Sequence, residues 1–201
     1  MPKLRDNSVP IWSGRNRRLC FLYEVILKTA VLPSTLKTLG SSAFQGCRVL
    51  DNIGESFPSG VKVIPYGCFR YCEKLTFTIP EGVTGIGNDA FGGCYQFSST
   101  LPSTLKSIGS SAFDYCSMQD LDIVLYDGIT ITGNDAFNGC KMKSISFPRT
   151  YTSISNGSSP LHRCSNLTDV TILSPTILDK GSSLGLPDNS NITIHVPDYL
   201  V

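Results

Sequence analysis

Cysteine is the residue type in this sequence most able to do chemistry, and eight cysteines occur among its 201 residues. Zinc sites use close pairs of cysteines that converge on one ion, and Cys68 and Cys72 are the only close pair. Six cysteines recur every 22 to 25 residues. Neighbours in such a column satisfy the Cα separation of a disulfide, but a regular ladder points every Sγ the same way, as small buried hydrophobic side chains do. We therefore expect reduced thiols and no metal site. The column is Cys47, Cys72, Cys94, Cys116, Cys140 and Cys164, with Cys20 as a candidate first member.

Catalysis by a cysteine requires a nearby base and an acid that orients the base. His162, Cys164 and Asp169 are the only such neighbourhood in the chain. Because Cys164 belongs to the regular column, we expect it to be buried and unreactive. The other histidine, His195, alternates with apolar residues and should face outward. No phosphate-binding or dinucleotide-binding glycine motif occurs, so the sequence predicts a protein without catalytic residues or a cofactor.

Charge is nearly balanced, with a net charge of +1, but it is unevenly distributed. Residues 1–18 hold five basic residues and one acidic residue, a net charge of +4, which leaves −3 for the remainder. We expect this arm to tether the protein to an acidic partner or simply to be solvated, and we expect no nucleic-acid binding because no basic column continues it. No apolar run is long enough to predict a membrane span. The tethering residues are Arg15, Arg17 and Arg18.

The cysteine column belongs to a repeat of 22 to 27 residues that is counted from proline to proline. Before the proline, apolar residues alternate as in Leu75-x-Phe77-x-Ile79, the period of a strand with one buried face. Apolar residues follow three and six places after the proline, and a glycine and an Ala-Phe pair come next. Thr132 is an exception to the apolar position six places on. The best copies cover residues 32–47, 57–72, 79–94, 101–116 and 125–140.

One strand cannot bury its apolar side alone, so successive copies must stack around a shared core. The sequence therefore predicts a β-rich repeat solenoid, a right-handed stack with one parallel strand per coil, placed directly before each proline. A second short extended edge follows the proline, and the Ala-Phe pairs of neighbouring coils interdigitate, with Phe91 and Phe113 buried in one column. We expect residues 1–30 to form the basic arm and a cap, and residues 31–201 the solenoid, with degenerate C-terminal coils.

Residues 79–94 (IPEGVTGIGNDAFGGC) and 101–116 (LPSTLKSIGSSAFDYC) resemble the BspA-like, or Treponema-type, leucine-rich repeat. The resemblance extends over roughly residues 30–197. It implies a leucine-rich-repeat solenoid without catalytic residues, of a kind displayed on bacterial or protist surfaces and associated with adhesion to proteins. Similar repeats also occur in viruses of gut bacteria. Exported members begin with a signal peptide, but Glu24 and Lys28 interrupt the apolar stretch after Leu19, so no clear signal peptide is recognised.

Outward positions of the predicted strands are not dictated by the core, so they carry the most information about function. They are rich in hydroxyl groups and nearly uncharged, which suits an extended protein partner, although threonine also suits strands for structural reasons. The expected partner-binding residues are Thr76, Thr78, Thr100, Asp122, Val124, Ser146, Leu173 and His195.

Two functional hypotheses follow. The first is a non-enzymatic, adhesin-like binding module, located at the cell surface or secreted, whose partner is an extracellular-matrix or microbial surface protein. The second is a structural component of an assembly such as a bacteriophage virion, docked onto a neighbouring subunit through its N-terminal arm and terminal coils.

Overall fold

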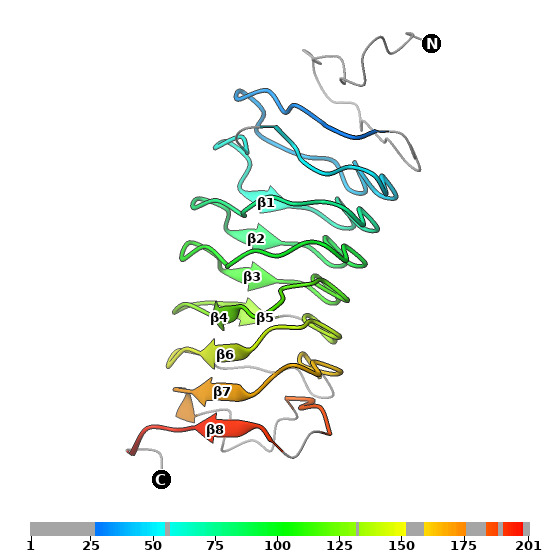
Figure 1. Ribbon diagram of the computed structural model, residues 1–201. Helices are drawn as coiled ribbons and strands as arrows, with labels where there is room; N and C mark the ends of the chain where they lie inside the picture. Colours follow the sequence, from blue (N-terminus) through cyan, green and yellow to red (C-terminus); the bar gives the residue numbers. More distant parts are fainter. Residues whose placement is uncertain are drawn as a thin grey trace, which may run out of the picture.

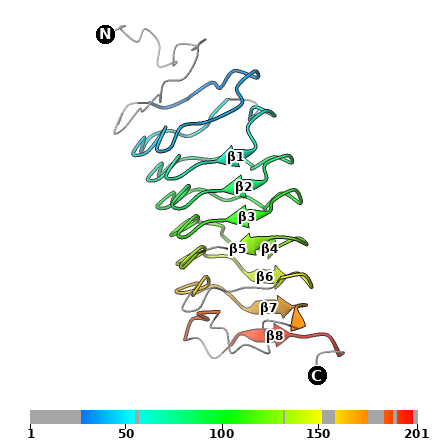
Figure 2. The ribbon, with the colours of Figure 1, turned by 180° about the vertical axis from the view of Figure 1, so that it is seen from behind.

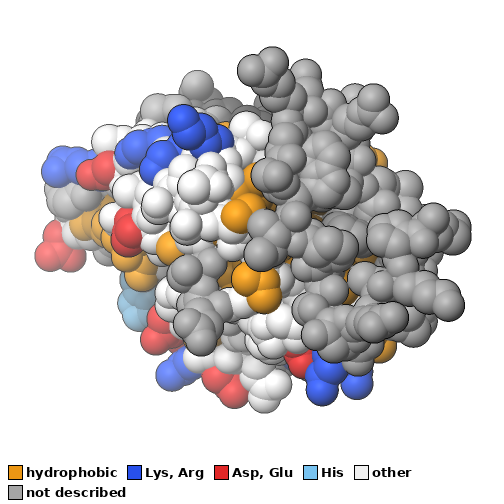
Figure 3. Space-filling view, turned by 90° about the horizontal axis from the view of Figure 1, so that it is seen from above, with side chains coloured by type: hydrophobic (Ala, Val, Ile, Leu, Met, Phe, Trp, Pro, Cys, Tyr) orange, Lys and Arg blue, Asp and Glu red, His pale blue; other side chains and the backbone are white. Residues whose placement is uncertain are grey.

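Flattened coils stack along one axis in a computed structural model of the chain, which describes residues 27–54, 57–131, 133–151, 159–175, 184–188 and 191–198 (Figure 1). Each coil has two extended limbs that run in opposite directions. A tight turn around the Ala-Phe pair joins them at one side of the stack, and a proline turn joins them at the other, as the opposite view also shows (Figure 2). From the N-terminal end, charged side chains of both signs are scattered around the rim (Figure 3). This arrangement confirms the predicted solenoid.

Two parallel sheets lie on the two limbs. The limb after the proline carries β1 (Val63–Ile64), β2 (Gly85–Ile86), β3 (Ser107–Ile108) and β5 (Thr130–Ile131), paired in that order. The limb before the next proline carries β4 (Asp122–Val124), β6 (Ser144–Phe147), β7 (Asp169–Ile172) and β8 (Thr193–His195), also paired in order. At the start of the stack, Thr29 pairs with Asn52 in an isolated parallel bridge, and Leu27 and Ala30 are buried in the core.

The earlier coils differ from the prediction that a strand precedes every proline. Residues 75–79 and 97–101 show the expected alternation of burial but form no strand. Ser99, which is buried, supplies the physical reason, because its Oγ accepts the N–H of Ile79 at 3.1 Å and donates to the carbonyl of Thr100 at 2.7 Å. A side chain thus takes the place of a ladder hydrogen bond, and in these coils the regular ladder lies on the other limb.

A shift of one residue in the backbone register resolves the exception at Thr132. Ile64, Ile86 and Ile108 lie opposite one another in β1, β2 and β3, and the next partner of Ile108 is Ile131. The backbone partner of Ile108 is therefore five places after Tyr126 and not six; position 132 lies outside the described residues.

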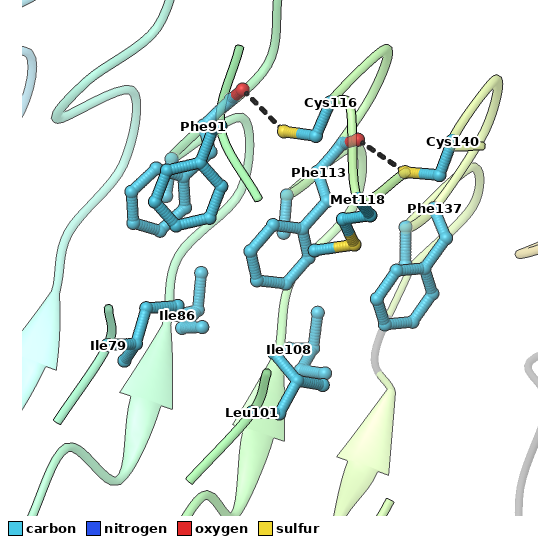
Figure 4. Close-up of a cluster of buried hydrophobic side chains, with 14 of the residues drawn as sticks. Ile79, Ile86, Phe91, Leu101, Ile108, Phe113, Cys116, Met118, Phe137 and Cys140 are labelled. Atoms are coloured by element: carbon cyan, nitrogen blue, oxygen red, sulfur yellow. Dashed lines mark hydrogen bonds between the residues drawn. The ribbon is translucent and has the colours of Figure 1, made fainter. Parts of the chain in front are cut away.

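A column of phenylalanine rings forms the centre of the core between the limbs. Phe91 and Phe113 are fully buried, with ring centroids 5.4 Å apart and planes at 2°, as the sequence predicted (Figure 4). Neighbouring members of the column are separated by 5.3 to 5.5 Å, so each coil adds about that length to the stack. The full column is Phe44, Phe69, Phe91, Phe113 and Phe137.

Beside this column, every described cysteine is buried, which confirms the prediction that they are small core residues. Each thiol from Cys72 onward in the ladder donates to the carbonyl of the phenylalanine in the preceding coil, at 2.9 to 3.2 Å. Figure 4 shows this contact from Cys116 to Phe91 and from Cys140 to Phe113. Cysteine recurs here because it combines a small apolar volume with a weak donor. The sequence pattern indicates the small apolar volume but not the hydrogen-bond donor.

Candidate interaction surfaces

Exposed side chains on the outer side of the limb before the proline turn form the first candidate surface, called the hydroxyl face. Strand register places the outward residues of β4, β6, β7 and β8 in two rows along the stack axis. Thr76, Thr78, Thr100, Asp122, Val124, Leu173 and His195 are exposed and Ser146 is half-buried. In the paired strands, one row is Asp122, Ser144, Asp169 and Thr193, and the other is Val124, Ser146, Thr171 and His195.

Leu173 is exposed but does not belong to either row. The register places Thr171 opposite Ser146, and the N–H of Leu173 donates to the carbonyl of Phe147 at 3.1 Å. Phe147 directly precedes its proline, whereas its partner in β7, Ile172, is followed by two further residues before the next proline. The longer coil accommodates these residues after the strand, so its outward pair is Asp169 and Thr171 and not Thr171 and Leu173.

Electrostatics on the hydroxyl face centre on Asp169. Its Oδ1 lies 3.0 Å from His195 Nε2, and its Oδ2 accepts the hydroxyl of Thr168 at 2.7 Å. The hydrogen bond from His195, followed by that from Thr168, holds the pKa of the Asp169 carboxyl below its ordinary value. In the same row, the hydroxyl of Ser144 donates to Asp122 Oδ1 at 2.7 Å. The two carboxylates of the row are therefore already engaged within the protein.

The catalytic neighbourhood considered from the sequence does not form. Asp169 contacts His195 and not His162, while the thiol of Cys164 is buried and donates to the carbonyl of Phe137 at 3.1 Å. Burial raises the pKa of Cys164 to about 12, so no thiolate is available near neutral pH. The expectation that Cys164 is buried is confirmed.

Along the Ala-Phe turns runs a second surface, which sequence reasoning missed. In five of these turns two residues adopt positive φ, and alternate N–H groups donate to the next coil, as from Phe91 to Ala112 and from Gly93 to Asp114. At the position just before the ladder cysteine, the positive-φ residues are Gly46, Tyr71, Gly93, Tyr115, Gly139 and Arg163. The signal was present in the sequence, because this position alternates between glycine and a large side chain.

Several tyrosines on this side of the stack are exposed, among them Tyr71 by 36%, Tyr95 by 56% and Tyr115 by 42%. Arg70 places its guanidinium carbon 4.8 Å from the ring centroid of Tyr71, and Arg163 donates to the hydroxyl of Tyr115 at 2.8 Å. We call these five residues the aromatic edge. Tyrosine and arginine are the residue types most enriched among energetically dominant interface contacts.

Within the described part of the chain, no group of three or more histidine, cysteine or acidic residues is arranged to hold a metal ion. The described residues contain no helix that is long and apolar enough to cross a membrane. The predicted tethering residues Arg15, Arg17 and Arg18, like Cys20, lie outside the described residues.

Residues 17–123 and 86–183 match the sequence profile of the BspA type leucine rich repeat region, in six copies. The chain belongs to the BspA-type leucine-rich repeat family. No curated protein matches this BspA-type chain.

Two crystal structures share the fold of this BspA-type protein. The T. pallidum leucine-rich repeat protein is 24% identical and matches with a TM-score of 0.59 over 86% of this chain and 79% of its own. A leucine-rich cell surface protein from Faecalibacterium prausnitzii is 20% identical and matches with a TM-score of 0.51 over 94% of this chain and 68% of its own.

Proposed function

We propose that this BspA-type protein is a non-enzymatic, adhesin-like module that binds an extended segment of a partner protein across its hydroxyl face. The observation that carries the proposal is the pair of exposed and half-buried rows that the register aligns over the coils of β4, β6, β7 and β8. Family membership supports a binding role, because repeat solenoids present long continuous surfaces. The description of the Faecalibacterium prausnitzii protein as a cell surface protein supports a location at the surface or outside the cell.

Physical chemistry favours this face for contact with a protein. Strands about 5 Å apart give the rows a regular spacing, and hydroxyl groups form hydrogen bonds without the large desolvation cost of unpaired charges. The carboxylates of Asp122 and Asp169 already accept hydrogen bonds within the protein, so each keeps a hydrogen-bond donor when a partner covers it. We assign the central contacts to Thr100, Val124 and Ser146, and the peripheral contacts to Thr76, Thr78 and His195.

Two lysines placed on the hydroxyl face test this proposal. Thr100→Lys with Val124→Lys should leave the melting temperature nearly unchanged, because both positions are exposed, while introducing two charges that binding must desolvate. We expect loss of binding to a panel of purified extracellular-matrix proteins, measured by surface plasmon resonance. Thr38→Lys with Val63→Lys, at exposed positions on the other limb, is the matched control and should bind normally. Normal binding by the first variant would reject the hydroxyl face as the binding surface.

A second candidate function, a component of a larger assembly, is favoured by the last strand. The alternation of Ile192, Ile194 and Val196 with polar residues predicts that Ile194 in β8 faces the core, but the residue is 48% exposed. β8 pairs with β7 on one side and ends the described sheet, so a neighbouring subunit could cover this residue. Fractionation of the native source distinguishes the two functions: an adhesin follows the cell envelope, and an assembly component sediments with particles. Deletion of residues 1–18 should weaken either attachment in a salt-sensitive way if the arm is a tether.

A further inference from the structure

A buried hydrogen-bond acceptor lies on the side chain of Asn138. The residue is only 7% exposed, and its side-chain oxygen Oδ1 is buried and accepts no hydrogen bond from any described residue. An unpaired acceptor in the interior costs free energy, and native proteins pair the large majority of such atoms. The unpaired oxygen of Asn138 therefore requires a physical explanation.

The nitrogen of the same amide group contacts a carboxylate. Nδ2 of Asn138 donates to Oδ1 of Asp114 at 2.6 Å, which is short for a hydrogen bond between nitrogen and oxygen. The two residues occupy equivalent places in successive Ala-Phe turns, directly after Phe113 and Phe137, whose rings stack at 5.4 Å (Figure 4). The backbone N–H of Tyr115 also donates to the carbonyl of Asn138 at 2.8 Å, so the backbone holds the two turns in this register.

The surroundings of Asp114 oppose its negative charge. Burial raises the pKa of its carboxyl above the ordinary value, and the carboxylates of Asp135 in the following coil and Asp89 in the preceding coil add to this effect. The hydrogen bond from Asn138 and the guanidinium of Arg70 act in the opposite direction but do not reverse it. Arg70 is itself engaged with Asp89, whose Oδ1 lies 3.6 Å from its Nε. The neutral form of Asp114 is therefore favoured more than that of an ordinary aspartate.

A protonated carboxyl group and an amide group are complementary to each other. Each then offers one donor and one acceptor along its edge, whereas a carboxylate only accepts. The bond from Nδ2 to Oδ1 of Asp114 is already formed, so a proton on Oδ2 of Asp114 can be donated to the unpaired Oδ1 of Asn138. The two hydrogen bonds together close a ring between the two groups. We propose that Asp114 and Asn138 form a proton-dependent clasp between two coils, which closes when acidification protonates Asp114.

Protonation of Asp114 stabilises the folded protein. The pKa of its carboxyl is higher in the folded protein than in the unfolded chain, where an aspartate has a pKa of about 3.9. The stabilisation is therefore fully present below the unfolded pKa and is lost as the pH rises through the folded pKa. Asp169 has the opposite dependence, because hydrogen bonds lower the pKa of its carboxyl. The clasp thus makes one junction of the stack firmer in acid than at neutral pH.

Asp114→Asn tests the clasp by closing it at every pH. The new amide can donate to Oδ1 of Asn138 without a proton from solvent, so the urea midpoint at pH 7 should rise by about 0.3–0.5 M, the effect of one added hydrogen bond. The gap between this variant and the unmodified protein should narrow as the pH is lowered to 4. Asp120→Asn, at an exposed position in the same coil, is the matched control and should leave the pH dependence unchanged.

Carbon-13 NMR of the unmodified protein tests the clasp without a variant that must fold. The side-chain carbonyl carbon of Asn138 should shift with pH at the same midpoint as the carboxyl carbon of Asp114, and that midpoint should lie above about 3.9, the value of an ordinary aspartate. The proposal is overturned if the carbon of Asn138 does not follow Asp114, or if Asp114→Asn fails to raise the midpoint at pH 7. It is also overturned if millimolar calcium stabilises the unmodified protein but not this variant, because a cation and not a proton would then join the two groups.

Discussion

At the residue scale, Phe91 shows how strongly the repeat depends on its core column. Its ring stacks on those of Phe69, Phe97 and Phe113 with centroid separations of 5.5, 4.3 and 5.4 Å. Phe91→Ala removes these contacts and leaves a cavity that neighbouring coils cannot fill, so the free energy of unfolding should fall by about 3–5 kcal/mol. Urea denaturation measures the change. Thr78→Ala, at an exposed position, is the control and should have almost no effect; equal effects would show that the core column is misassigned.

The burial of the thiols in the cysteine ladder can be tested at the same scale by alkylation. Cys94 and Cys116 are fully buried, and burial raises the pKa of both well above the ordinary value near 9. Iodoacetamide at pH 8 should therefore leave the ladder unmodified in the folded protein and alkylate it completely after denaturation without reductant. Intact-protein mass spectrometry provides the measurement. Recovery of a disulfide-linked peptide containing Cys94 and Cys116 would contradict the structure.

At the element scale, glycine in the limb after the proline is needed for close approach and not for positive φ. A Cβ at Gly109 would lie 2.5 Å from the backbone nitrogen of Asn88 in the preceding coil. Gly109→Ala must therefore separate two coils or distort a turn, and it should lower the free energy of unfolding by about 1–3 kcal/mol. Gly92→Ala is the matched control, because its nearest neighbour would be 3.5 Å away, and its effect should stay below about 1 kcal/mol. Thermal and urea unfolding of the two variants provide the comparison.

At the scale of the whole molecule, the buried thiols predict unfolding in alkaline solution. Burial raises the pKa of six of them, namely Cys68, Cys72, Cys94, Cys116, Cys140 and Cys164. The folded protein keeps these protons when the unfolded chain begins to lose them near pH 9, so this stabilisation is present below pH 9 and declines as the pH rises further. Each titrating thiol contributes a slope of about 1.4 kcal/mol per pH unit.

Urea midpoints between pH 7 and pH 11 measure this slope. Cys94→Ala with Cys116→Ala should lower stability at pH 7 but flatten the decline above pH 9, because two fewer thiols titrate in the unfolded chain. An unchanged slope in this variant would mean that other groups control the alkaline transition.

Local patterns in the sequence were sufficient for the solenoid, the phenylalanine column and the buried thiols. Each of these features depends on side-chain size recurring at a fixed period, and stacked coils repeat the same environment at every step. The outward positions of Thr78, Thr100 and Val124 were predictable for the same reason, because alternation along a limb determines which side chains face the core. Their role in binding stays a prediction.

Tertiary structure alone decided which limb carries the hydrogen-bonded ladder, where the register shifts, and how the turns pack. The hydroxyl oxygen of Ser99 accepts the N–H of Ile79. The longer coil places Asp169 in the row predicted for Thr171. Both outcomes depend on contacts with the neighbouring coil. The aromatic edge depends on such contacts too, since the ring of Tyr71 covers a glycine 22 positions further along the chain. A repeat pattern read along one coil describes what each coil buries, but the contacts between coils determine what the stack presents to solvent.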